Sequence, residues 1–303
     1  MINGFVIIDK PAGITSHDVV SRVRRILGTR KVGHTGTLDP FATGVLPIAV
    51  NNGTKVIPFL DEGSKTYEAL LLLGITTDTL DMTGAVLSDS DPSAVTEEQF
   101  ISCIAGFTGA LSQVPPMYSA IKQNGQPLYK LARQGVEVER KARDVEIYSI
   151  KLLSFDLPLI SIRVVCSRGT YVRSLADDIG RKLGCGAALQ ELRRCASGPF
   201  HLENSVALAD LETAVSEMRA MDLCLSPMSV LEHLPEIPLS QVGLEGLRFG
   251  RSPSWSATLL ENPLACTEET AVRLTADGNL VAIGKLIPTC GSDSVITLKR
   301  VLI

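Results

Sequence analysis

The sequence predicts an α+β fold: a mixed, largely antiparallel sheet flanked by helices, followed by a small C-terminal β-barrel. Strand-like and helix-like segments follow one another along the 303 residues without a regular strand–helix–strand rhythm, which disfavours a doubly wound sheet. A composition of 45% hydrophobic and 20% charged residues is that of an ordinary globular protein. A chain of this length usually forms more than one domain, so we expect a large domain and a small one.

The first expected elements are a strand and a helix. Residues 4–8, Gly-Phe-Val-Ile-Ile, have the pattern of a buried strand. Ser16 is a candidate N-cap for a helix whose apolar residues recur at helical spacing until Gly28 ends it. The N-terminus has no basic leader and no long apolar stretch, so we expect a first strand there and not a signal peptide.

Two more helices and three strands follow. Thr96 and Gln99 have the spacing of a capping box at the start of a helix. Residues 170–184 place an apolar stripe along a second helix, formed by Val172, Leu175, Ala176, Ile179 and Leu183. Apolar and β-branched runs predict strands at 67–74, 145–155 and 159–167.

A domain boundary is expected where prolines interrupt the chain. Pro227, Pro235 and Pro238 prevent a long helix, and we place the domains at 1–232 and 233–303. Beyond the boundary, short strand patterns surround an Asp-Gly turn at 277–278. This arrangement is typical of a small β-barrel.

Several classes of protein are disfavoured by composition. The longest apolar runs are far shorter than the roughly 18 to 20 residues that span a bilayer. Seven cysteines, an odd number without a C-x-x-C pair, indicate free thiols in a reducing compartment and not disulfides or a zinc site. We therefore expect a cytoplasmic protein without membrane contact.

Basic residues are concentrated in one segment, although the net charge is −4. Between 122 and 143 only Glu137 and Glu139 oppose six basic side chains, which are Lys122, Lys130, Arg133, Arg140, Lys141 and Arg143. Such a cluster fits a phosphate-contacting surface or a solvated face, and the charge pattern alone favours neither.

The loop at 31–47 holds one histidine and one aspartate among glycines, threonines and prolines. A rigid loop of this kind suits a carboxylate held at a fixed point against a ligand. Asp39 followed by Pro40 is equally typical of a simple turn. The loop is not a P-loop, because no lysine follows its last glycine, and it offers too few ligands for a metal.

Segment 33–47, GHTGTLDPFATGVLP, closely resembles the active-site motif of the TruB family of tRNA pseudouridine synthases. Further blocks at 9–20, 65–84, 115–140 and 166–194 also resemble the family's segments and come in its order. Together they cover roughly residues 4 to 200. The C-terminal part loosely resembles the PUA domain that accompanies this catalytic domain, mainly through GKLIP at 284–288 and LKRVL at 298–302.

This resemblance implies an isomerase that converts uridine 55 in the T-loop of tRNA to pseudouridine, without cofactor, metal or guide RNA. Asp39 matches the catalytic aspartate of the family, and Arg173 matches the arginine that pairs with it. Tyr67 matches the tyrosine that packs against the target base and is a candidate to remove the C5 proton. Taken singly, Tyr67 would be typical of a core and Arg173 of a solvated helix.

The resemblance also implies substrate contacts. His34 matches a histidine that contacts the RNA and holds the nucleotide flipped out of its stack. Tyr171 and Leu192 match residues at the substrate and the uracil pocket. Lys10 and Pro11 match a segment that supports the active-site loop.

Residues 117–143 resemble the family's thumb, an insertion that closes over the T-loop. Its six basic residues would then contact tRNA phosphates, while the shape of the folded loop would provide selection. We expect tRNA as the partner, no obligatory protein partner, and a monomer.

Three alternatives remain open. The related guide-RNA-dependent synthases of archaea and eukaryotes share similar loop residues but lack the thumb. A catalytically silent RNA-binding module, with Asp39 as a turn residue, is disfavoured by the intact set of Asp39, Tyr67 and Arg173. A small-molecule enzyme that uses the same loop is disfavoured by the basic thumb.

Overall fold

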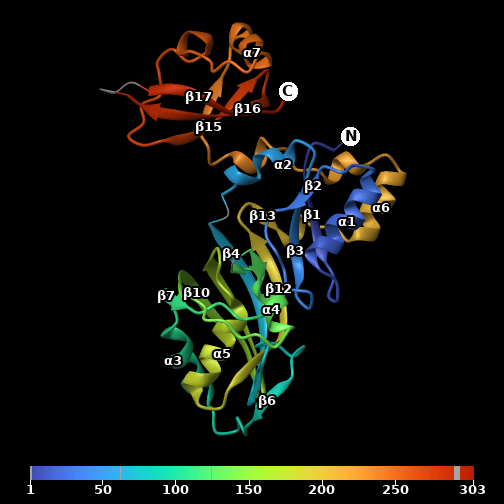
Figure 1. Ribbon diagram of the computed structural model, residues 1–303, viewed down its shortest axis with the longest axis vertical. Coiled ribbons are helices and arrows are strands. Elements are labelled where there is room, and N and C mark those ends of the chain that lie inside the picture. Colours follow the sequence, from blue (N-terminus) through green and yellow to red (C-terminus); the bar gives the residue numbers. More distant parts are fainter. Residues whose placement is uncertain (1, 62, 124, 290–293) are drawn as a thin grey trace.

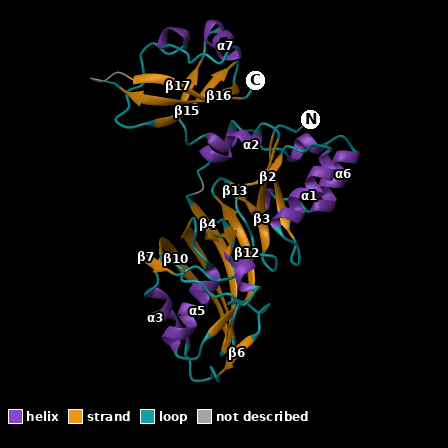
Figure 2. Ribbon diagram, viewed as in Figure 1, coloured by secondary structure: helices purple, strands orange, loops and turns teal. Residues whose placement is uncertain are grey.

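The computed structural model describes residues 2–61, 63–123, 125–289 and 294–303. It has a long sheet that carries most of the chain and a smaller C-terminal sheet at one end of the long axis (Figure 1). Helices and strands alternate irregularly along both parts, as the secondary-structure colouring shows (Figure 2).

The long sheet runs in the order β1-β3-β12-β4-β11-β10-β7, with β2 beside β3 and β13 beside β12. Its strands are β1 (Gly4–Lys10), β2 (Val32–His34), β3 (Thr43–Val50), β4 (Ser64–Leu73), β7 (Gly109–Gln113), β10 (Arg143–Asp156), β11 (Leu159–Ser167), β12 (Ala187–Ser197) and β13 (Phe200–His201). Among the described residues, β3 and β12 form the one parallel pair in this sheet. The predicted mixed, largely antiparallel sheet is confirmed.

Helices and small hairpins surround this sheet. The helices are α1 (Ser16–Leu27), α2 (Gly53–Val56), α3 (Glu97–Ala105), α4 (Leu128–Ala132), α5 (Val172–Leu183), α6 (Leu208–Ser216) and α7 (Gln241–Arg248). The hairpins pair β5 (Ile75–Thr77) with β6 (Val86–Asp89), and β8 (Lys122–Gln123) with β9 (Gln126–Pro127). Short 3-10 turns lie at Ile57–Phe59, Leu202–Asn204, Ala220–Leu223, Ser229–Leu231 and Trp255–Ala257.

Helix α1 begins one residue earlier than its sequence suggests. Thr15, and not Ser16, is the N-cap, and it forms a capping box with Asp18. Ser16 is instead buried, and its hydroxyl accepts a hydrogen bond of 2.9 Å from the Leu38 amide. Position 16 therefore attaches the helix to the loop at 31–47, which a capping rule based on residue type does not reveal. Gly28 ends the helix at φ +62°, as predicted.

Helices α3 and α5 pack against the long sheet. Helix α3 has the predicted capping box of Thr96 and Gln99, and α5 ends at Gly184 in the left-handed region. The two helices lie side by side (Figure 1), with Phe100 and Ile179 fully buried in the main core. The apolar stripe predicted on α5 is the face that holds it against β12 and β4.

The C-terminal part forms an open sheet and not the closed barrel that we expected. Its order is β14 (Glu236–Pro238), β15 (Thr270–Ala276), β16 (Asn279–Pro288) and β17 (Ser294–Val301). Within the described ranges no pairing joins the edge strands β14 and β17, and β14 is only three residues long, so the sheet does not close. The predicted hairpin turn is confirmed, because Asp277 and Gly278 both have positive φ.

The last residues of the chain join the C-terminal sheet to α2, which lies beside β1 and β3 of the long sheet. The Asn52 amide donates to the Leu302 carbonyl at 2.7 Å, and the Lys55 ammonium donates to the Val301 carbonyl at 3.0 Å. Ile283 and Leu302 share a buried cluster with Phe5 on β1. The two sheets are therefore joined by packed apolar side chains as well as by hydrogen bonds.

We predict that Ser16→Ala lowers the free energy of unfolding by about 1–3 kcal/mol, because it leaves the buried Leu38 amide without its hydrogen-bond acceptor. Denaturant titration measures the change. Ser21→Ala on the exposed face of the same helix is the control, and it should be neutral or slightly stabilising, since alanine is the better helix former. Equal losses in both variants would show that the Ser16 bond does not anchor the loop.

Candidate functional site

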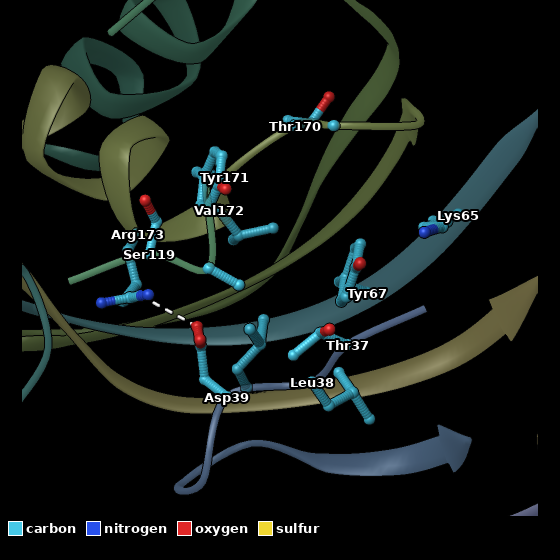
Figure 3. Close-up of a pocket in the computed structure, with 13 residues that line it drawn as sticks. Thr37, Leu38, Asp39, Lys65, Tyr67, Ser119, Thr170, Tyr171, Val172 and Arg173 are labelled. Atoms are coloured by element: carbon cyan, nitrogen blue, oxygen red, sulfur yellow. Dashed lines mark ion pairs between the residues drawn. The ribbon is translucent and has the colours of Figure 1, made fainter. Parts of the chain in front are cut away.

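A pocket forms where the loop at 31–47 meets β4, β12, the residues before α5 and the base of the 117–143 segment (Figure 3). The site therefore draws on parts of the chain that are far apart in the sequence. The pocket is lined by Thr37, Leu38, Asp39, Lys65, Tyr67, Ser119, Ala120, Gly169, Thr170, Tyr171, Val172, Arg173 and Leu192.

Asp39 and Arg173 form the ion pair that the sequence predicted. Arg173 Nε lies 2.9 Å from Asp39 Oδ2, and Figure 3 marks this contact with a dashed line. The Asp39 side chain is 32% exposed, whereas that of Arg173 is only 4% exposed. The carboxylate therefore faces the pocket while its counter-charge is enclosed by the protein.

Arg173 is held from several sides. Its Nη1 donates to the Thr79 carbonyl at 3.0 Å, and its Nη2 donates to the Tyr118 carbonyl at 2.8 Å. Asp81 Oδ2 lies 3.3 Å from Nη1 and provides a second negative charge. A planar guanidinium with these partners has one orientation, so Arg173 presents its Nε to Asp39 at a fixed place.

Asp81 is a site residue that the sequence reasoning missed. It is 2% exposed, and its Oδ1 accepts hydrogen bonds from the Thr79 hydroxyl at 2.9 Å and the Thr83 amide at 3.0 Å. The available signal was an acid among threonines inside the block at 65–84. Its burial beside Arg173 depends on the fold, since the two residues are distant in the sequence.

The charge of Asp39 is balanced between opposing effects. Burial raises the pKa of its carboxyl above the ordinary value, Arg173 lowers that pKa, and the nearby Asp81 raises it further. The net direction is upward. An ionised Asp39 is consequently poorly solvated by water and depends on Arg173, which is the environment of a reactive carboxylate.

Tyr67 lies on β4 with its ring directed into the pocket (Figure 3). The residue is 7% exposed, and burial raises the pKa of its phenol. Across the sheet, Tyr67 pairs with Arg194 on β12, whose guanidinium opposes that rise. Arg194 is a second residue that the sequence reasoning did not select.

Tyr171 and Leu192 complete the lining that was predicted. The Gln113 side chain accepts from the Tyr171 amide at 2.8 Å and donates to the Tyr171 carbonyl at 3.1 Å. This bidentate contact fixes the backbone immediately before α5. Leu192 on β12 is 7% exposed and forms an apolar wall of the pocket.

Lys10 and Pro11 lie behind the loop and outside the pocket lining. The Lys10 ammonium is fully buried and donates to the carbonyls of Pro11 at 2.9 Å, Ile14 at 2.8 Å and Pro40 at 3.1 Å. Burial lowers the pKa of Lys10 to about 8. One side chain thus joins the turn after β1 to the residue that follows Asp39.

His34 does not line the pocket. It lies on β2 with its ring edge-on to that of His17, at a centroid distance of 5.4 Å. Its Nδ1 is buried without a hydrogen-bond partner, and burial lowers the pKa of the imidazole. The structure therefore separates His34 from the group formed by Asp39, Tyr67 and Arg173.

The basic segment at 117–143 begins at the pocket and extends away from it. Its exposed basic side chains are Lys122, Lys130, Arg133, Lys141 and Arg143. Arg140 differs, because its Nη1 donates to the Pro115 carbonyl at 3.1 Å and it pairs with Glu137 at 3.8 Å. Arg140 thus holds the end of the segment near its start, and the other five present their charge to solvent.

The described part of the chain has no group of three or more His, Cys, Asp or Glu that could hold a metal ion. None of the helices in those ranges is both long and apolar enough to cross a membrane. The cysteines at 103, 166, 185, 195, 224 and 266 are free thiols, and Cys290 lies outside the described residues.

Comparison with known proteins agrees with the resemblance. Residues 24–172 match the model of the TruB family pseudouridylate synthase N-terminal domain, and residues 173–231 match that of the tRNA pseudouridylate synthase B C-terminal domain.

Relatives named tRNA pseudouridine synthase B align over most of the chain. The Geotalea uraniireducens protein is 50% identical over 284 residues, which are 94% of this chain and 92% of that protein. The Geobacter sulfurreducens protein is 49% identical over 282 residues, or 93% of each. A chain in the crystal structure of a Cbf5-Nop10-Gar1 complex superposes with a TM-score of 0.75 at 29% identity, over 99% of this chain and 85% of that one. Since the family models and these relatives span the pocket and the sheet that supports it, the chain belongs to the TruB family of pseudouridylate synthases, which are isomerases.

Proposed function

We propose that this protein isomerises uridine 55 in the T-loop of tRNA to pseudouridine, with Asp39 as the catalytic carboxylate and without a guide RNA. The observation that carries the proposal is the Asp39–Arg173 ion pair in a pocket that Tyr67 also lines. The relatives at about half identity are named tRNA pseudouridine synthase B, which supports tRNA as the substrate.

The chemistry needs a carboxylate near the sugar. The bond between N1 of the base and C1′ breaks, the uracil turns over, and C5 bonds to C1′ in its place. Asp39 either adds to C1′ or takes the 2′ proton to give a glycal-like intermediate, and both routes use the same ionised oxygen that Arg173 orients. Uridine and pseudouridine have the same atomic composition, so no cofactor is required to balance the reaction.

The target base has to enter the pocket from a folded loop. A stacked uridine must flip out at a cost of a few kcal/mol, which contacts to the base and the backbone offset. Tyr67 and Leu192 supply an aromatic and an aliphatic surface for the flipped uracil. His34, outside the pocket and beside His17, is suited to contact the RNA next to the flipped nucleotide.

The exposed charges of the 117–143 segment support direct tRNA binding. Ser119 and Ala120 line the pocket, and the five exposed basic residues follow along the same segment. When the target nucleotide enters the pocket, the phosphates of the surrounding T-loop and stem would lie beside this thumb. We propose a monomer in which residues 1–232 carry out catalysis and residues 233–303 form an accessory unit.

Incubation of the purified protein with an unmodified tRNA transcript, EDTA and no guide RNA tests the function. We expect pseudouridine at position 55 with the parent protein. Asp39→Asn should abolish the product and leave tRNA affinity nearly unchanged, because it keeps the shape of the side chain and removes the ionised oxygen. Modification at another position, no modification, or the parent rate in Asp39→Asn would each refute the proposal.

The same substitution should stabilise the fold. Burial raises the pKa of Asp39 in the folded state, so its ionisation costs folding free energy as pH rises through that pKa. Asp39→Asn removes this cost, and Arg173 keeps Asp81 as a partner. We predict a higher thermal midpoint than the parent at about pH 7, with a smaller difference in mild acid.

Asp81→Asn is the matched control for this stability measurement. It removes the carboxylate that is buried with Arg173, so it should lower the midpoint at about pH 7. If Asp39→Asn lowers the thermal midpoint as Asp81→Asn does, ionisation of the Asp39 carboxyl does not reduce the stability of the folded protein.

Neutralising the thumb should weaken tRNA binding and its dependence on salt. For Lys130→Gln with Arg133→Gln we predict a salt slope that is smaller by about one unit per lost phosphate contact. Arg181→Gln is the control, because Arg181 is already paired with Asp177 and Asp178. Binding titrations at several salt concentrations that give the same slope for all three proteins would exclude these thumb residues as phosphate contacts.

A further inference from the structure

Arg194 occupies the point where three strands of the long sheet meet beside the site. On β12 it pairs with Gly44 of β3 on one side and with Tyr67 of β4 on the other. Gly44 has φ +99°, and a Cβ there would lie 2.3 Å from the Arg194 carbonyl oxygen, so only glycine lets the two strands approach this closely. The Arg194 side chain is fully buried.

The guanidinium of Arg194 bonds to both sides of the loop that carries Asp39. Its Nη2 donates to the Gly36 carbonyl at 3.2 Å and its Nη1 to the Thr37 carbonyl at 3.4 Å, both before Asp39. Its Nε donates to the Val45 carbonyl on β3 at 2.7 Å, after the loop. One planar group thus sets the distance between the two ends of the catalytic loop.

The charge of Arg194 has no acidic partner. Within the described residues it forms no ion pair, whereas the neighbouring Arg193 pairs with Asp9 at 2.7 Å and is part-exposed. A buried cation without a counter-ion is costly for the fold. Backbone carbonyls accept hydrogen bonds from the Arg194 guanidinium, but no carboxylate cancels its net positive charge. Tyr67 is the cross-strand neighbour of Arg194 on β4, so its phenol is one of the groups on which this charge acts.

We propose that Arg194 is a positioning residue for the isomerisation: it fixes the Asp39 loop relative to Tyr67, and its uncompensated charge stabilises negative charge on the Tyr67 oxygen. The inference rests on the proposed function, and in particular on Tyr67 as the group that removes the C5 proton. This role explains why Arg194, a cation, occupies a buried strand position that an apolar side chain could fill.

The proton balance shows where this charge is needed. A phenol cannot accept a proton, so Tyr67 must first release its own hydroxyl proton to solvent. The phenolate then takes the proton from C5 of the rejoined base, N1 takes up a proton from solvent, and the phenol is restored as the base becomes pseudouridine. The intermediate phenolate carries one negative charge in a buried site, where a neighbouring cation lowers its free energy.

Single-turnover rates at saturating tRNA test the proposal after the parent has been shown to form pseudouridine. Arg194→Gln should slow the reaction at least about tenfold with tRNA affinity unchanged, while Arg193→Gln changes the rate less than about twofold. A parent protein without activity would refute the proposed function itself. A parent-like rate in Arg194→Gln, with an active parent, would overturn only the role of Arg194.

A second measurement separates the electrostatic role from a structural one. Incorporation of 3,5-difluorotyrosine at position 67 makes the phenol easier to ionise. In Arg194→Gln, the fluorinated residue should raise the single-turnover rate at least about threefold over the same variant with tyrosine. In Arg193→Gln it should have no comparable effect. A loss in Arg194→Gln that the fluorinated residue does not relieve would overturn the proposal.

Arg194→Lys keeps the proposal testable if Arg194→Gln does not fold, which thermal unfolding will show. Lysine retains the charge, but its single ammonium cannot reproduce the fork of three bonds to Gly36, Thr37 and Val45. We expect a folded protein that is slowed at least about fivefold at unchanged tRNA affinity. A folded Arg194→Lys protein at the parent rate would overturn the proposal.

Discussion

The burial of Arg173 is the constraint on which the site depends. Its guanidinium has to be satisfied inside the protein, and it draws Asp39, Asp81 and the carbonyls of Thr79 and Tyr118 around itself. Those partners come from the loop at 31–47, the hairpin region after β4 and the base of the thumb. A single side chain at the start of α5 therefore connects three segments that are far apart in the sequence.

Much of the fold follows from local patterns in the sequence, and the features that do not are set by tertiary contacts. The capping box at Thr96, the glycine stop of α1 and the Asp277–Gly278 turn are local and were predicted correctly. Ser16 was misassigned because its burial, and not its residue type, decides its partner. The C-terminal barrel was wrong because closure depends on whether edge strands pair, which alternation along each strand does not specify.

The same distinction applies to the site. The motif resemblance identified Asp39, Tyr67, Tyr171, Arg173 and Leu192, all of which line one pocket. It did not identify Asp81 or Arg194, since a charged residue inside a strand or a polar loop usually points to solvent. Their burial becomes visible only when the sheet places β12 against β4 and the threonine-rich turn against α5. Buried charged residues are therefore the part of the site that sequence patterns predict least well.

The two buried arginines differ in their partners and in the pocket residue that each lies beside. Arg173 is matched by two carboxylates, so it fixes geometry around Asp39 while adding little net positive charge. Arg194 is matched by carbonyl dipoles alone, so it leaves positive charge close to Tyr67. The pocket therefore has a carboxylate held beside one arginine and a phenol beside the other. Both arginines start from regular elements, α5 and β12, so their charges are held in place before a ligand enters the pocket.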